Sequence, residues 1–332
     1  MAKKSSQGDS QTPHPVLGEQ FSPWSKDQKG EGKAFAIYET VETIKLDGKT
    51  IELKKPRIDF QFHDKSIEKP IYSLRMARPL VGLGLLEAVP EEQLLALKKA
   101  PCKKNVNNTF NFIKDPITGM KKIGRFGWKA SKVSVQHQNA AALQMDMGVS
   151  NDLFPQGKCP PGTAAKTCKN PKKLASKDLE NITVYMQSLG VPGRIHPRGS
   201  STLRGEKIFM EIHCNACHTP TLYTDQSHPL VELRGQAIHP FTDLMIHDLG
   251  PHMGDNRSEG EAKGSQWRTS PLWGLGHGKY VNKDAGFLHD GRAKDLTEAI
   301  LWHGGEALFS KKRFIALTSQ ERKDLISFLN SL

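Results

Sequence analysis

The chain has 332 residues, of which 37% are hydrophobic and 7% aromatic, and its formal net charge is +12. This apolar content excludes a disordered chain, and no apolar run approaches the ~18 residues that a membrane helix needs. The positive charge is spread along the sequence without a recognition helix or finger, so it favours acidic protein partners or anionic cofactors over nucleic acid, and a solvated basic surface is the simplest explanation. The length predicts two domains.

The first part of the chain predicts a small antiparallel β element at residues 33–62, where "KAFAIYETVETIKLDGKTIELKKPRIDFQF" is rich in strand-forming residues and "LDGKT" supplies a turn. Helical patterns follow. Pro90 begins the helix of "VPEEQLLALKK", Gly148 ends that of "SKVSVQHQNAAALQMDMG" and Gly190 ends that of "SKDLENITVYMQSLG". The last helix, "TSQERKDLISFLNSL", begins with Thr318 and Glu321 at capping-box spacing. We therefore expect a mainly α fold.

Between two of these helices lies "PQGKCPPGTAAKTCKNPKK", whose proline and glycine content predicts a loop. Cys159 and Cys168 bracket its middle, and a disulfide between them would restrict the unfolded chain by roughly 2.5 to 3 kcal/mol in the chain-entropy model. We prefer this disulfide to metal binding because no histidine lies nearby at zinc-ligand spacing. Cys102 is then expected to stay free.

The stretch "EIHCNACHTP" holds Cys214, Cys217 and His218 in the order Cys-x-x-Cys-His. The cysteine pair alone fits a redox dithiol or half a zinc site, but the dithiol needs a strand-then-helix context and zinc a second Cys or His pair. The histidine directly after the second cysteine favours a c-type haem, because both thiols can form thioethers with the vinyl groups while the imidazole binds the iron.

Haem attachment of this kind and a disulfide both indicate a compartment outside the cytoplasm, and we expect the periplasm. The opening "MAKKSSQGDSQTPHPVLGEQ" has no apolar signal region, so we expect the true start to lie upstream of Met1.

Five further stretches resemble known proteins: "GRFGWKAS", "FTDLMIHDLG", "WRTSPLWGLG", "FLHDGRAKDLTEAILWHGGEA" and "ERKDLISFLNSL". From about residue 15 to its end, the chain resembles the thiol oxidoreductase-like di-haem proteins within the superfamily of di-haem cytochrome c peroxidases and MauG. The resemblance implies two cytochrome c-like domains. Residues 1–198 would form an incomplete first domain with the β insertion and the disulfide loop, and residues 199–332 a C-terminal haem domain.

In that superfamily a tryptophan lies between two haems on the electron path, and a glutamine and an acidic residue serve the peroxidatic haem. Trp128, Gln138 and Asp146 occupy the similar positions, although Asp146 stands two residues early and is shorter than the usual glutamate. Without the resemblance, Trp128 would be an ordinary core aromatic and the other two would be helix surface.

The resemblance also implies groups that hold the porphyrin carboxylates. His289 and Arg292 in "LHDGR" are expected to contact haem propionates, because a planar guanidinium suits a carboxylate. The alternative is a helix-entry turn held by Asp290. Calcium near the seam between the domains is expected from family likeness alone.

The sixth ligand of the haem iron has two candidates. Thr269 stands in "WRTSPLWG", where peroxidases of the superfamily often have a methionine. Met253 in "GPHMGD" and His247 in "MIHDLG" could replace it, although residues of either kind more often serve packing or surface roles. His303 in "LWHGGEA" is expected to be structural.

An internal repeat supports a duplicated haem domain, because "FGWKASKVSVQHQ" and "FLHDGRAKDLTEA" align at an offset of 161 residues and pair Trp128 with His289. The sequence holds one Cys-x-x-Cys-His motif, so a second would have to precede Met1. We expect an oxidoreductase of the di-haem peroxidase kind. Electrons from a small redox protein would enter through the haem at His218, pass Trp128, and reduce peroxide or oxidise a protein substrate at the other haem. The alternative is a mono-haem electron-transfer cytochrome c.

Overall fold

The computed structural model of the chain describes residues 2–4, 11–14, 17, 20–21, 23, 30–99, 106–107, 109–155 and 173–332. The expected disulfide between Cys159 and Cys168, and the free thiol of Cys102, lie outside these residues. Within them, no helix is both long enough and apolar enough to cross a membrane.

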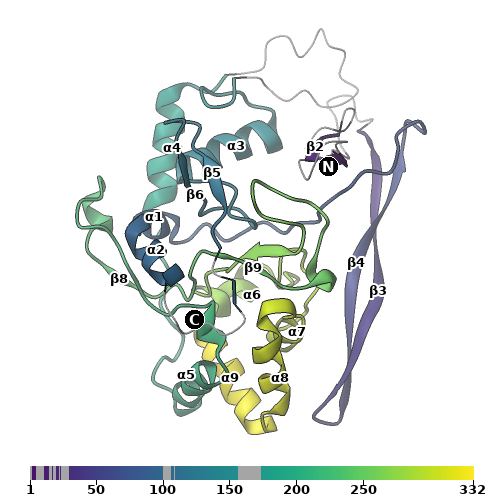
Figure 1. Cartoon of the computed structure of the whole chain (residues 1–332), viewed down its shortest axis with the longest axis vertical. Coiled ribbons are helices and arrows are strands. Elements are labelled where there is room, and N and C mark those ends of the chain that lie inside the picture. Colours follow the sequence, from purple (N-terminus) through teal and green to yellow (C-terminus); the bar gives the residue numbers. More distant parts are fainter. Residues whose placement is uncertain are drawn as a thin grey trace.

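The β element expected at residues 33–62 is present as one long hairpin (Figure 1). Strands β3 (Gly32–Leu46) and β4 (Lys49–Phe62) pair antiparallel, with one bulge between Thr40 and Glu42. The two-residue turn consists of Asp47 and Gly48, at φ values of 51° and 72°. An Asp-Gly pair with both φ angles positive is the turn that matches the twist of a hairpin.

The turn end of this hairpin packs against helices from the far end of the chain. Leu46 and Leu53 are buried in the same apolar cluster as Phe314 and Phe328. Close to the turn, the Arg322 guanidinium donates to both carboxylate oxygens of Asp47, at 3.1 and 2.6 Å. The hairpin therefore runs along one side of the molecule and is fixed to the C-terminal helices (Figure 1).

The α-helices of the described residues are α1 (Leu83–Glu87), α2 (Glu91–Lys99), α3 (Val135–Met147), α4 (Ser176–Ser188), α5 (Ser200–Glu211), α6 (Gly278–Val281), α7 (Leu296–Leu301), α8 (Leu308–Ala316) and α9 (Ser319–Ser331). Four of them, α2, α3, α4 and α9, lie where the sequence predicts helices. Gly148 ends α3 in the left-handed region, and Thr318 and Glu321 form the predicted capping box of α9.

The remaining strands form short antiparallel pairs: β1 (Ala2–Lys4) with β2 (Gln11–Pro13), β5 (Phe112–Lys114) with β6 (Lys121–Ile123), β7 (Leu222–Tyr223) with β8 (Ala237–Ile238), and β9 (Ile246–Asp248) with β10 (Gln266–Arg268). The structure is 35% helical and 20% strand. The expected fold class, mainly α in the manner of cytochromes c, is therefore wrong. Between α5 and α7 the chain forms short strands, 3-10 turns and glycine turns, and the four-residue α6 is the one α-helix there.

Two large apolar clusters and a third one of three residues form the core of the described part of the chain. The first contains the hairpin end together with α5, α7, α8 and α9, and the second contains α1, α2 and the start of α3 together with residues of β7, β8 and the chain before β9. In the first cluster α5 and α9 cross closely, because a Cβ at Gly205 would lie 2.0 Å from the main-chain oxygen of Asp324. Both clusters draw residues from either side of residue 198, and the domain boundary expected there stays a prediction.

The internal repeat has a structural counterpart. Equivalent single bridges, Phe126 with Lys132 and Phe287 with Ala293, precede α3 and α7. Each helix is then capped by an equivalent side chain, Ser134 or Asp295, which accepts a hydrogen bond from the main-chain N–H three residues on. The repeated sequence thus encodes a repeated loop and helix start, and it brings Trp128 and His289 into edge contact, with ring centroids 6.4 Å apart.

Candidate haem site

The Cys-x-x-Cys-His motif follows α5 directly. His213 turns the chain with a φ of 65°, and Cys214–Ala216 form a single 3-10 turn. Both Cys214 and Cys217 are free thiols and half-buried. Burial raises the pKa of Cys214 to about 12, and the neighbouring Cys217 adds to the effect. The turn thus holds two free thiols, and that of Cys214 stays neutral against the apolar core.

His218 is fixed in the form that can bind a metal. Its Nδ1 lies 2.9 Å from the main-chain oxygen of Phe241. A carbonyl oxygen only accepts hydrogen bonds, so Nδ1 carries the proton and Nε2 keeps its lone pair. Burial lowers the pKa of His218 to about 4, which keeps the ring neutral at physiological pH. Two thiols and an imidazole with a free Nε2 fit a c-type haem.

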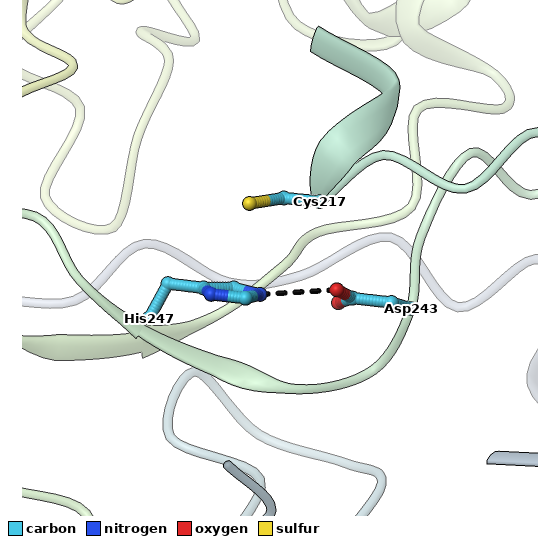
Figure 2. Close-up of side chains that lie close together, drawn as sticks. All are labelled: Cys217, Asp243 and His247. Atoms are coloured by element: carbon cyan, nitrogen blue, oxygen red, sulfur yellow. Dashed lines mark hydrogen bonds and ion pairs between the residues drawn. The ribbon is translucent and has the colours of Figure 1, made fainter. Parts of the chain in front are cut away.

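Cys217 lies beside a buried charged pair (Figure 2). The Nε2 of His247 is 3.1 Å from Asp243 Oδ2, and its Nδ1 is 3.0 Å from Glu306 Oε2. Burial opposes a charge on His247, but the Asp243 carboxylate outweighs it and raises the pKa well above its usual value. The ligand atoms of Cys217, Asp243 and His247 lie within 4.8 Å of one another, close enough for one metal ion. An imidazolium has no lone pair to offer, so we assign the trio to an ionic network.

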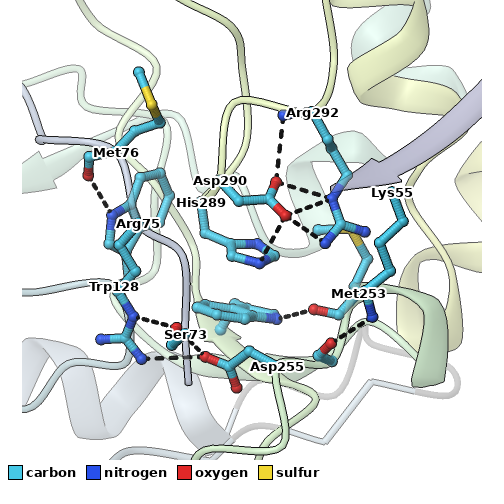
Figure 3. A network of polar contacts seen from close by, with 12 residues as sticks. Lys55, Ser73, Arg75, Met76, Trp128, Met253, Asp255, His289, Asp290 and Arg292 are labelled. Carbon is cyan, nitrogen blue, oxygen red and sulfur yellow. Dashed lines mark hydrogen bonds and ion pairs between the residues drawn. The ribbon is translucent and has the colours of Figure 1, made fainter. Parts of the chain in front are cut away.

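A second polar network surrounds His289 and Arg292 (Figure 3). The His289 ring stacks on Trp267, with centroids 3.8 Å apart and an interplanar angle of 16°. The Arg292 guanidinium donates to both oxygens of Asp290, at 2.8 and 2.6 Å. One of its Nη1–H groups points at the sulfur of Met253, 3.8 Å away. The Arg292 fork is thus already engaged by the Asp290 carboxylate, which is the alternative that the sequence left open.

His289 itself keeps one unpaired polar atom. The ring is 3% exposed, and among the described residues its Nδ1 has no hydrogen-bond partner. Burial lowers the pKa of His289 to about 2, and the Arg292 charge adds to the effect. The imidazole is therefore neutral.

Lys129 anchors this network from below the Trp267 ring. Its side chain is fully buried, and its Nζ donates to the main-chain oxygens of Lys263, Gly264 and Gln266 at 2.9 to 3.0 Å. The ammonium also lies 3.3 Å from Asp255 and 3.9 Å from the Trp267 ring centroid. Burial lowers the pKa of Lys129 to about 8. The ammonium thereby ties the chain next to Trp128 to the loop that leads into β10.

Trp128 lies beside the second network, in edge contact with His289. Its indole N–H donates to the main-chain oxygen of Met76 at 2.9 Å, and the Arg78 guanidinium lies over its ring at 4.3 Å. The main-chain oxygen of Trp128 accepts from the N–H of Arg268 at 2.9 Å. The tryptophan is therefore fixed on both its ring and its backbone.

Arg78 and Arg268 are two cations that sequence reasoning did not single out. Arg268 is 4% exposed, and its Nε has no hydrogen-bond partner in the described part of the chain. Burial lowers the pKa of Arg78 to about 10; burial, and then the charge of Arg78, also lower the pKa of Arg268. No carboxylate of a described residue is paired with either guanidinium.

The geometry can now be compared with known proteins. A sequence model of the family described as "Di-haem oxidoreductase, putative peroxidase" matches residues 16–332. The chain belongs to this family. Among solved structures, hydrazine synthase from Kuenenia stuttgartiensis shares 20% identity with a TM-score of 0.32, over 48% of this chain and 56% of that one. This chain thus spans about half of that relative, and no curated protein matches the sequence.

Gln138 and Asp146, the two residues expected at the peroxidatic haem, do not lie together. Gln138 packs beside Gly127, the neighbour of Trp128. Asp146 is exposed near the end of α3 and accepts a hydrogen bond from Gln20. Eight residues of helix separate Gln138 from Asp146, or ~12 Å. The roles expected of Gln138 and Asp146 stay predictions, and the separation indicates that they would not act on one atom.

The cavity near the expected calcium position offers no unpaired carboxylate among the described residues. A cavity of about 260 Å³ lies between β4, residues 70–74 and the network of Figure 3. Asp255 and Asp290 both line it, but Arg75 and Lys129 pair with the first and Arg292 with the second. Calcium stays a prediction.

Proposed function

We propose that the protein is a c-type haem oxidoreductase in which Cys214 and Cys217 hold the haem through thioethers and His218 binds its iron. The observation that carries this proposal is the tautomer of His218, whose Nδ1–H is donated to the Phe241 oxygen while Nε2 stays free, next in the chain to two free thiols. When bound, the haem supplies one-electron chemistry. The protein supplies attachment, orientation and a buried environment.

We propose further that electrons pass from this haem by way of Trp128 towards a peroxidatic haem of the di-haem peroxidase kind. Trp128 is held by Met76, Arg78 and Arg268, and such fixation supports a role in a defined electron path. A small acidic redox protein is the electron donor that the net charge of +12 favours. Peroxide or a protein is the substrate, and the proposed covalent haem attachment supports a location in the periplasm.

The second candidate is a mono-haem electron-transfer cytochrome c, which the single Cys-x-x-Cys-His motif of the sequence favours. The two functions differ in their response to peroxide. Turnover needs an iron with an open sixth position and a group that moves protons, whereas electron transfer needs neither.

Expression with a periplasmic haem-maturation system tests the proposal. The purified chain should give a pyridine haemochrome and a mass increase of one haem, and Cys217→Ser should disturb attachment. A chain that never takes up haem would refute the proposal. A steady-state assay with peroxide and a reduced cytochrome then separates the two candidates. In a di-haem form of the protein, Trp128→Phe should slow peroxide-driven oxidation of the donor without changing haem content, and it should leave direct reduction of the haem at His218 unaffected.

A further inference from the structure

The segment that carries His303 is built against the haem motif. Gly304 and Gly305 follow His303 and allow the main chain to pass close to the residues after His247. A Cβ at Gly305 would lie 2.2 Å from the main-chain oxygen of Asp248, and Gly305 has a φ of 52°. Any larger residue there would push the two segments apart, so the "HGGE" sequence fixes where His303 lies.

Glu306 fixes the same segment from its other end. Its carboxylate accepts from the N–H of Asp248 at 3.1 Å and lies 3.0 Å from Nδ1 of His247. His247 in turn groups with Cys217. His303 therefore stands three residues before Glu306, whose carboxylate contacts His247 in the ionic network beside Cys217.

The His303 ring is prepared in the same way as that of His218. Its Nδ1 lies 2.7 Å from the main-chain oxygen of Ala299, so Nδ1 carries the proton and Nε2 keeps its lone pair. No hydrogen bond from a described residue reaches that Nε2. Burial lowers the pKa of His303, which keeps the ring neutral.

The two ligand candidates from the sequence lack this preparation. Both ring nitrogens of His247 face carboxylates, which hold the ring as a cation. The sulfur of Met253 points at the Arg292 guanidinium within the network of Figure 3. Of the three candidates His247, Met253 and His303, it is His303 that keeps a free lone pair, on a segment that packs against the residues beside Cys217.

We propose that His303 is the second axial ligand of the haem that His218 binds. The inference rests on the proposed function, since it requires that haem. A second histidine gives a six-coordinate iron with a lower potential than a histidine–methionine pair. Such a haem relays electrons and does not open to peroxide, which agrees with the relay role proposed for it.

The haem-loaded protein tests this ligand by its spectra. The wild-type ferric protein should be low-spin, without the far-red absorption band of a methionine-to-iron bond. His303→Ala should become high-spin, and added imidazole should restore the low-spin spectrum, which shows that the variant has folded. His303→Met should gain the methionine band and a higher midpoint potential. Met253→Leu and His247→Gln are the matched controls and should leave the iron low-spin.

Two results would overturn the ligand while leaving the proposed function intact. One is a haem-loaded His303→Ala that stays low-spin with an unchanged spectrum, and the other is a wild-type protein that is already high-spin. A methionine band in the wild type that Met253→Leu removes would assign the ligand to Met253. Absence of haem from the wild-type chain would refute the proposed function as well.

The guanidinium groups of Arg78 and Arg268, two residues that both contact Trp128, carry a second inference. The Arg78 guanidinium donates to Ser270 Oγ at 3.2 Å, and Ser270 stands two residues after Arg268 in the chain. Thr269 lies between Arg268 and Ser270, and its buried hydroxyl also has no hydrogen-bond partner among the described residues. The buried guanidinium of Arg268, the half-buried guanidinium of Arg78 and a free hydroxyl together form a site for an anion with several oxygens.

Main-chain hydrogen bonds connect this stretch to the haem motif. The hydroxyl of Thr242 donates to the Thr269 oxygen at 2.6 Å, and the N–H of Thr242 donates to the oxygen of Thr219, next to His218. We infer that Arg78 and Arg268 bind haem propionates, in place of the already paired Arg292. This inference too rests on the proposed haem.

The pH dependence of the haem midpoint potential tests this pair in the haem-loaded protein. Propionates held by two guanidiniums stay ionised, so the wild-type potential should change little between about pH 5 and 8 from this source. In Arg78→Leu/Arg268→Leu their pKa values rise, and the potential should fall with rising pH across that window. Arg268→Lys, which keeps a cation at this position, should have the flat pH profile of the wild type. Arg198→Leu, which removes an exposed charge, should have the same flat profile.

All these variants keep the ionic network beside Cys217, formed by His247, Asp243 and Glu306. Any titration of that network therefore contributes equally to each pH profile and cancels when the profiles are compared. A flat profile in the double variant would overturn the inference. So would a sloped profile that Arg292→Leu alone produces.

Discussion

Lys129→Met replaces the buried ammonium below Trp267 by a side chain of similar length without donors. Three main-chain oxygens at 2.9 to 3.0 Å and the Asp255 carboxylate at 3.3 Å lose their partner. Breaking a buried charge pair costs about 3–5 kcal/mol. Asp255 keeps Arg75 and Ser73, so its charge is not left unpaired. We therefore expect the lower end, a loss of about 3 kcal/mol in the free energy of unfolding.

Urea unfolding of the haem-loaded protein, followed by tryptophan fluorescence, measures this loss. Lys121→Met is the matched control, because its ammonium is 63% exposed and pairs with an exposed Glu261. It should cost less than about 0.5 kcal/mol. If Lys129→Met lost less than about 1 kcal/mol, or no more than the control, the carbonyl oxygens around Nζ would not depend on the ammonium and the reasoning would fail.

Three further predictions concern stability. Hydrogen bonding from Arg204 lowers the pKa of Asp324 to about 2, so the carboxylate stabilises the fold above about pH 4 and this contribution is lost as the pH falls towards 2. Because Arg204 is half exposed, Asp324→Asn should cost about 1 kcal/mol at pH 7, and urea midpoints of variant and wild type should converge near pH 2. Thr318→Ala should cost about 1 kcal/mol by loss of the capping box, with Thr318→Ser close to wild type in the same assay. Leu53→Ala should cost about 2–5 kcal/mol in thermal unfolding, whereas Ile37→Ala at a half-exposed position should be nearly neutral; equal losses would contradict the burial of the hairpin end.

The sequence predicted those features that local patterns determine. The Asp-Gly hairpin, the capping box at Thr318 and the Cys-x-x-Cys-His turn all depend on residues within a few positions of one another. The mainly α expectation failed because residues 212–295 have no periodic apolar pattern, and their fold depends on glycine turns and distant packing.

The missed site residues share another property. Arg78 and Arg268 are 190 positions apart in the sequence. Arg78 contacts the Trp128 ring and Arg268 its main-chain oxygen, so no sequence spacing could connect the two arginines. His303 was expected to be structural because a lone histidine near a helix end usually is. Its hydrogen bond to Ala299 and its contact with the segment after His247 are visible only in three dimensions. The sequence did contain one signal, the two glycines that follow it.

The hairpin also bears on how the protein is made. Asp47 and Arg322 are 275 residues apart, yet the burial of Leu46 and Leu53 depends on α9, which is synthesised much later than the hairpin. At 5–20 residues per second, translation leaves these leucines and an unpaired strand edge exposed for roughly 15–50 s. During this interval the exposed hairpin end favours binding by a holding chaperone, and it is buried only once α9 has left the ribosome.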